Sequence, residues 1–271
     1  MLETIIYILI FLMGTFFGSF FTLAVYRIPL GENITHKHSF CPNCKHKLGI
    51  LDLIPIISYI FLGGKCRYCK NKIKPRYLLL EILSGIVFVL LAISIRINLY
   101  NIEIYKIAHL VFFILYFCSL FIIAGIDKEK KTIQRSVLLY GIVVVTMYIT
   151  YLYMVEKTNI YRYVIYLLII LVLVIIDTIK LRKKAESNYT VQILILCMYM
   201  SLFAGEEICI LTIIYTLLAI AIYLLGKKIL EKNKKYNVKE VNEERMPIGF
   251  FLCVTNVILI ICMNFIINYI V

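Results

Sequence analysis

The chain has 271 residues, of which 62% are hydrophobic, and its mean hydropathy is +0.91. This apolar fraction exceeds what the core of a water-soluble domain of this length can bury, which excludes a soluble globular protein. The formal net charge is +13. Nucleic-acid binding is one interpretation of that charge, but the placement of the basic residues favours another.

Eight stretches are predicted to span a membrane, because about 20 apolar residues are needed to cross ~30 Å of hydrocarbon. The first lacks the basic start and the small-residue cleavage site of a signal peptide, so we expect it to be retained. The sixth and seventh are separated only by Gly205-Glu206-Glu207, which predicts a tight turn at a membrane surface, since acidic side chains are costly in lipid. The predicted spans are residues 4–26, 77–95, 104–124, 136–154, 161–179, 190–204, 207–226 and 249–270.

The basic residues are distributed very unevenly between the segments that connect these spans. Four segments hold 25 of the 29 Lys and Arg residues: 27–76, 125–135, 180–189 and 227–248. By the positive-inside rule, these segments are cytoplasmic and both ends of the chain lie outside. A topology signal, together with attraction to anionic lipid headgroups, accounts for the charge without nucleic acid.

The first of these segments, residues 29–76, carries four cysteines in two pairs. Cys41-x2-Cys44 and Cys66-x2-Cys69 are separated by twenty-one residues, a spacing typical of zinc ribbons. A segment of this size buries too little core to fold without a staple. Two disulfides are the alternative, but the cytoplasm keeps thiols reduced. The sequence therefore predicts a Zn²⁺ site with these four cysteines as ligands.

An ordered set of motifs flanks the cysteines and resembles the type IV prepilin peptidases, the leader peptidases and N-methyltransferases of type IV pilus and competence systems. Near the C-terminus, Met246-Pro247-Ile248-Gly249 resembles the start of that family's last span. The resemblance implies eight spans with both ends outside, in agreement with the topology inferred from charge. The motifs are Gly18-Ser19-Phe20, Tyr26-Arg27-Ile28-Pro29, Asp52-Leu53-Ile54-Pro55, Gly64-x-Cys66-Arg67-Tyr68-Cys69, and Arg76-Tyr77 with Glu81.

The resemblance also implies an aspartic peptidase of the Gly-x-Gly-Asp type, whose two aspartates share one proton near the cytoplasmic ends of membrane helices. One carboxylate activates a water while the other polarises the scissile carbonyl. Asp127 matches the first aspartate, whereas Thr190 stands at the position of the second and the motif glycines are absent. A hydroxyl cannot replace a carboxylate as a base. Asp177, on the same side of the membrane, is the other candidate for the second carboxylate.

The predicted fold is an all-α polytopic membrane protein with about eight transmembrane helices and a small cytoplasmic zinc-ribbon-like insert between the first two. The predicted boundaries are 1–28 for the first transmembrane helix, 29–76 for the zinc-binding domain, and 77–271 for a transmembrane aspartic-peptidase-like domain. The expected location is the bacterial cytoplasmic (inner) membrane.

The predicted function is removal of the leader from prepilin-like precursors at the cytoplasmic face, followed by N-methylation. The cofactors are Zn²⁺ and, by resemblance only, S-adenosylmethionine. The partners are prepilin-like precursors and membrane lipid, without nucleic acid. The alternative is a pseudo-peptidase that binds prepilins or pilus-assembly proteins without cleaving them. A third interpretation is a membrane protein whose zinc ribbon is only a structural staple.

Overall fold

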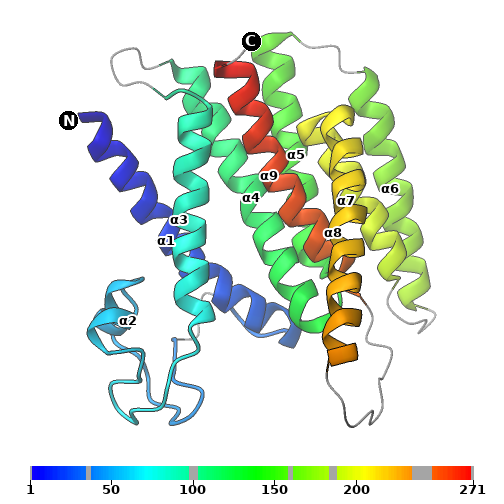
Figure 1. Ribbon diagram of the computed structural model, residues 1–271. Helices are drawn as coiled ribbons and strands as arrows, with labels where there is room; N and C mark the ends of the chain where they lie inside the picture. Colours follow the sequence, from blue (N-terminus) through cyan, green and yellow to red (C-terminus); the bar gives the residue numbers. More distant parts are fainter. Residues whose placement is uncertain are drawn as a thin grey trace. The chain divides into compact units, whose positions relative to one another are not determined.

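The structure is a computed structural model that describes residues 2–34, 38–97, 103–157, 161–182, 188–233 and 246–269. The chain is helical, and within these ranges the only strand-like pairs are two isolated β-bridges, one beside each cysteine pair (Figure 1). It divides into two compact units: Met1–Ile114 with Asn264–Val271, and Leu115–Met263. We call them unit 1 and unit 2 and describe each by itself.

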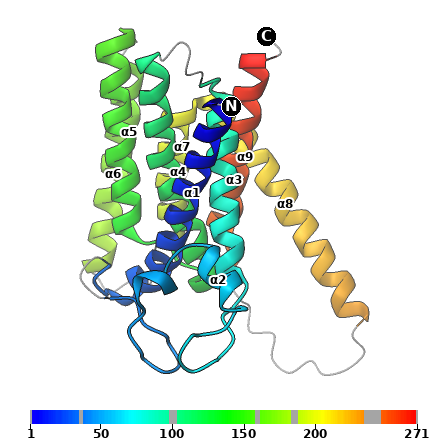
Figure 2. The ribbon, with the colours of Figure 1, turned by 90° about the vertical axis from the view of Figure 1, so that its left-hand side faces the viewer.

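Unit 1 is built on two helices, α1 (Leu2–Arg27) and α3 (Arg76–Ser94), which pack side by side (Figure 2). Small residues let their backbones approach closely, as is common between membrane helices. A Cβ atom at Gly14 would lie 2.8 Å from the Cα of Gly85, and the hydroxyl of Ser84 donates to the Gly14 carbonyl at 2.7 Å. The insert between these helices contains η1 (Ile28–Leu30), η2 (Ile50–Asp52) and α2 (Ile57–Phe61).

Unit 2 holds the remaining membrane helices around α7, which contacts α5, α6 and α8. The ring of Tyr116 stacks on Phe203 with centroids 3.9 Å apart, and its hydroxyl donates to Asn256 at 2.8 Å. Asn256 in turn donates to Thr212, so these buried polar groups are hydrogen-bonded, as a lipid environment requires. The helices are α4 (Ile104–Lys130), α5 (Arg135–Glu156), α6 (Tyr161–Arg182), α7 (Tyr189–Ala204), α8 (Glu206–Asn233) and α9 (Ile248–Tyr269).

Within the described ranges, seven helices are long and apolar enough to cross a membrane, and α7 is a shorter apolar helix of 16 residues. They correspond one to one with the eight predicted spans, so the all-α polytopic fold is confirmed. Only Gly205 separates α7 from α8, and its φ of 92° is readily adopted by glycine. The predicted tight turn is therefore present. The division between the units falls inside α4, and the predicted domain boundaries remain a prediction.

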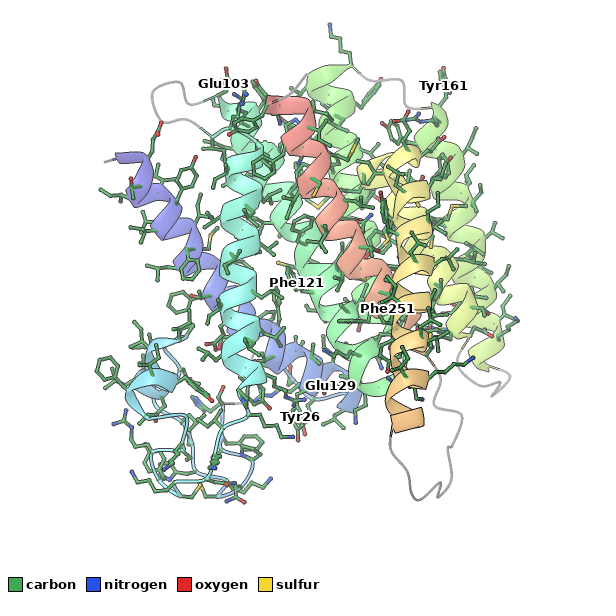
Figure 3. The ribbon with its side chains drawn as sticks, viewed as in Figure 1. Tyr26, Glu103, Phe121, Glu129, Tyr161 and Phe251 are labelled. Carbon is green, nitrogen blue, oxygen red and sulfur yellow. The ribbon has the colours of Figure 1, made fainter. Side chains whose placement is uncertain are left out.

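The helices of unit 2 alternate in direction, so several chain segments meet at one end of the bundle. This end of the bundle holds the end of α4, the start of α5, the end of α6 and the starts of α7 and α9 (Figure 1). In Figure 3, Glu129 and Phe251 lie in the half of unit 2 away from Tyr161, which marks the opposite end. Asp127 is two residues before Glu129, so the candidate active site lies at the end of the bundle opposite Tyr161.

Candidate metal centre and candidate active site

The two cysteine pairs have the same local backbone. In each pair, the N–H of the first cysteine bonds to the carbonyl five residues later, and that cysteine's own carbonyl accepts the N–H four residues later. Lys45 and Lys70, which follow the second cysteines, adopt left-handed φ values of 59° and 57°. These turns fold each Cys-x2-Cys pair into a knuckle and direct both of its thiols to one side.

The four predicted ligand atoms converge in the structure. The sulfur atoms of Cys41, Cys44, Cys66 and Cys69 all lie within 4.8 Å of one another, and those of Cys41 and Cys69 are 3.8 Å apart. Zn–S bonds of about 2.3 Å in a tetrahedron require sulfur–sulfur separations of about 3.8 Å. All nine cysteines lie in the described ranges and none forms a disulfide. The geometry fits a metal such as zinc.

In two of the four cysteines, backbone hydrogen bonds favour the thiolate form that a metal needs. A hydrogen bond from the backbone of Asn71 lowers the pKa of Cys69 to about 6. The pKa of Cys41 is also lowered, chiefly by a hydrogen bond from the backbone of Cys44. The cluster therefore contains thiols that ionise more readily than an ordinary cysteine.

An acidic residue between the knuckles ties the second knuckle to the rest of the insert. Asp52 forms an ion pair with Arg67 at 2.6 Å and accepts the N–H of Gly49 at 3.2 Å. The ring of Tyr68, the next residue in the knuckle, lies 3.6 Å from the ring of His46 in the first. Asp52, Arg67 and Tyr68 belong to the motifs noted in the sequence. Their contacts join the second knuckle to η2 and to the first knuckle.

Asp127 is fully buried near the end of α4, and three groups make its surroundings polar. The hydroxyl of Tyr189, the first residue of α7, donates to Asp127 Oδ2 at 2.9 Å. The backbone N–H of Phe250, in the first turn of α9, donates to the same oxygen at 2.9 Å, and the N–H of Gly249 donates to the Tyr189 hydroxyl at 3.1 Å. The start of α9 thus supplies two of the N–H groups that a helix cannot bond internally.

The close approach of the first turn of α9 to Asp127 depends on a glycine. A Cβ atom at Gly249 would lie 3.1 Å from Asp127 Oδ2 and 3.2 Å from Ile133 Cδ1, closer than ordinary van der Waals contact. The glycine of the Pro-x-Gly motif therefore has a local explanation. It lets the first turn of the last span reach the carboxylate.

Three buried polar atoms near the starts of these helices have no hydrogen-bond partner among the described residues. They are Asp127 Oδ1, Gln192 Oε1 and Asn188 Nδ2. Gln192 lies three residues after Tyr189, on the same face of α7. Buried polar atoms are normally paired with protein or water, so these atoms are expected to bind water or a polar substrate group.

The other two predicted catalytic residues lie elsewhere. Thr190 is exposed, because one step along a helix rotates a side chain by about 100° away from its neighbour. Asp177 is buried and forms an ion pair with Arg135 at 2.6 Å, and the Arg135 guanidinium also donates to its backbone carbonyl. No hydrogen bond or ion pair among the described residues joins Asp177 or Thr190 to Asp127.

Tyr189 is the site residue that sequence reasoning missed. It directly precedes Thr190, and a phenol has no place in the expected two-carboxylate pattern. The signal that could have found it is its position at the start of an apolar helix, within one residue of the expected aspartate.

The family model that matches this chain lies within unit 1 and does not reach Asp127. Residues 12–95 match the family model "Bacterial Peptidase A24 N-terminal domain". Proteins named prepilin leader peptidase/N-methyltransferase from Klebsiella pneumoniae, Myxococcus xanthus and Bacillus subtilis are 41%, 37% and 36% identical to this chain. These alignments cover 30%, 30% and 34% of this chain and 38%, 24% and 37% of those proteins. No solved structure is significantly similar. Residues 12–95, which hold the motifs around the metal centre, are thus similar to the N-terminal domain of the bacterial A24 peptidases and to proteins named prepilin leader peptidase/N-methyltransferase.

Proposed function

We propose that this protein is a prepilin leader peptidase and N-methyltransferase that processes type IV pilin-like precursors. The observation that carries the proposal is the family match over α1, the insert and α3, which includes all four cysteines and Asp52. Relatives with this activity in their names are 36–41% identical to this chain over 81–91 residues. The methyl donor would be S-adenosylmethionine, and the insert would hold Zn²⁺.

The orientation in the membrane is part of the proposal. The basic segments, the insert and the Asp127 end of unit 2 would face the cytoplasm of a bacterial inner membrane, with both chain ends outside. A prepilin leader is cleaved at that face, so the buried carboxylate and the substrate would meet on the same side. Nothing in this arrangement calls for nucleic acid as a partner.

Asp127 is the proposed catalytic base. Its Oδ1, which has no hydrogen-bond partner among the described residues, would take a proton from a water as the water oxygen attacks the scissile carbonyl carbon. The same carboxyl group would then return that proton to the departing amide nitrogen. The phenol of Tyr189 shares its proton with Oδ2 at 2.9 Å, an arrangement that resembles the single proton shared by two carboxyl groups in aspartic peptidases. Tyr189 would thus supply the donor that the missing second aspartate provides elsewhere.

A specific observation also favours the pseudo-peptidase alternative. Both donors that reach Asp127 come from the protein itself, and no second carboxylate is bonded to it among the described residues. In that case Asp127 would serve to anchor the starts of α7 and α9, and the protein would bind prepilins without cleaving them.

The test is leader removal from a prepilin by the purified full chain in lipid nanodiscs, followed by mass spectrometry. Wild-type protein should release the leader, and Asp127→Asn should lose activity by about 10²–10⁴-fold. The matched control is Glu129→Gln, which neutralises an exposed carboxylate two residues away and should change little. If wild-type protein binds the prepilin but does not cleave it, the pseudo-peptidase proposal is supported. If wild-type protein neither binds nor cleaves the prepilin, the peptidase proposal and the pseudo-peptidase proposal are both wrong.

A further inference from the structure

The insert carries several exposed apolar side chains on its short elements η2 and α2. Phe61 at the end of α2 is 87% exposed, and Ile50 in η2 is 86% exposed. The two short elements contact each other, so these exposed side chains come from neighbouring elements. We call this set the apolar edge: Ile50, Leu51, Ile57, Ile60 and Phe61. Large apolar side chains left exposed in this way indicate a binding surface.

The position of the apolar edge along α3 indicates what covers it. The backbone N–H of Ile56, directly before α2, donates to Glu81 Oε2 at 2.8 Å. Glu81 lies five residues into α3, a candidate membrane span, which is about 7.5 Å along its axis. The start of α2 is therefore held level with the first turns of a membrane-spanning helix.

The figures agree with this placement within unit 1. In both views α2 lies beside the insert end of α3, whereas the loops of the insert extend farther from the two helices (Figures 1 and 2). Leu79 and Leu83, which flank Glu81 on α3, are themselves exposed, as expected of a surface that faces lipid. With α3 spanning a bilayer, the apolar edge would lie at the depth where headgroups meet acyl chains.

The attachment of α2 to α3 is specific. Ile56 has φ 62° and ψ −53°, an unfavourable backbone conformation for a β-branched residue, and the N–H of Ile57 closes the turn on the Pro55 carbonyl at 2.6 Å. The hydrogen bond to Glu81 helps to hold this turn. Since α2 begins directly after it, the turn fixes the height of the apolar edge.

The charge of the surrounding segment also fits a membrane surface. Residues 27–76 contain ten Lys and Arg against two Asp and Glu. Basic residues close to a membrane are attracted to anionic lipid headgroups. Apolar side chains with basic neighbours are typical of segments that lie in a membrane interface.

We propose that the apolar edge docks into the bilayer leaflet on the insert side, with Phe61 and Ile60 at the boundary between headgroups and acyl chains. This contact holds the metal centre against the membrane surface at a fixed height. It does not depend on the proposed catalytic activity.

The chain has no tryptophan, so a single introduced tryptophan reports its own surroundings. The probes are Phe61→Trp, with Ile60→Trp as a second position in the apolar edge. Phe16→Trp, an exposed position inside α1, is the lipid control, and Tyr68→Trp in the second knuckle is the water control. Each full-length variant is placed in nanodiscs that contain anionic lipid, with and without brominated acyl chains.

We expect brominated lipid to quench Phe61→Trp and Ile60→Trp about as strongly as Phe16→Trp, with emission at shorter wavelength than Tyr68→Trp. Acrylamide in the water should quench Tyr68→Trp most. If both apolar-edge probes respond to acrylamide as Tyr68→Trp does and are unaffected by brominated lipid, the proposal is wrong. The patch would then be open to a protein partner.

Discussion

The hydroxyl of Tyr189 lies 2.9 Å from Asp127 Oδ2 and donates its proton to it, one residue before the position where the family resemblance places a second aspartate. The neighbouring N–H of Gly249 donates to the Tyr189 oxygen, so the phenol is fixed between two elements. A residue that both contacts the candidate base and carries a proton is suited to polarise a carbonyl in a water-poor site.

The first prediction concerns this phenol. Tyr189→Phe keeps the ring and removes only the donor, so leader cleavage should fall by about 10²–10³-fold in kcat, the usual effect of losing one preorganised donor. KM should change much less, because the substrate's remaining contacts are retained. Cleavage rates over a range of prepilin concentrations measure both. A kcat within about two-fold of wild type would exclude Tyr189 from the chemistry.

The second prediction compares residues 189 and 190 as positions at which a second carboxylate could be introduced. Thr190→Asp places the new carboxylate at an exposed position and should not increase cleavage, whereas Tyr189→Asp directs it towards Asp127. The aspartate side chain is several ångströms shorter than tyrosine, so a bridging water must complete the contact. If Tyr189→Phe is inactive, Tyr189→Asp should then recover part of the lost rate, since two linked carboxyl groups can share one proton. Recovery by Thr190→Asp alone would mean that α7 is rotated by about one residue from the orientation described here.

The same one-residue offset shows what the sequence can and cannot predict. The length of the apolar stretches and the uneven distribution of Lys and Arg predicted eight helices. This was possible because a membrane span needs a long apolar stretch and basic cytoplasmic loops whatever helices pack beside it. Cysteine spacing predicted the metal cluster, since the ligands of each knuckle are close in sequence. The partner of Asp127 could not be predicted in this way. It comes from a helix about sixty residues away, and its rotation about its axis is fixed by packing rather than by local sequence.

The third prediction tests the approach of α9. Gly249→Ala puts a Cβ atom 3.1 Å from Asp127 Oδ2, so the first turn of α9 must shift and the bond from Phe250 should weaken. We expect a loss of about 1–3 kcal/mol in stability, visible as a lower thermal unfolding temperature in detergent, together with reduced cleavage. Gly226→Ala in α8 is the matched control. A Cβ atom there meets nothing within 4 Å, and alanine favours helix more than glycine does.

The fourth prediction concerns metal content. The purified chain should contain a single zinc ion, measured by elemental mass spectrometry, and Cys66→Ser should lose it because it removes a buried ligand. Cys262→Ser, at an exposed position in α9 far along the chain from the cluster, should retain it. Full zinc retention by Cys66→Ser would show that the four sulfur atoms do not form the site.

The fifth prediction concerns Asp52 and pH. Burial acts to raise the pKa of Asp52, but hydrogen bonds from Arg67 and Gly49 and the charge of Arg67 outweigh it and lower that pKa below its usual value. A group whose pKa is lowered by folding stabilises the fold above its unfolded pKa, about 3.9, and this contribution is lost as the pH falls through the folded value. Asp52 is therefore ionised throughout the range from about pH 5 to pH 8.

It follows that Asp52→Asn should weaken zinc binding by a constant factor across that range. We expect about 10-fold, the lower end of the usual effect of residues that support metal ligands without binding the metal. Zinc affinity itself should fall with decreasing pH in wild type and variant alike, because thiolates must be deprotonated to bind. Lys65→Gln, which removes an exposed charge outside the Asp52–Arg67 pair, is the control. A ratio of affinities that changes between pH 6 and pH 8 would show that Asp52 titrates there and that the ion pair with Arg67 does not hold its charge.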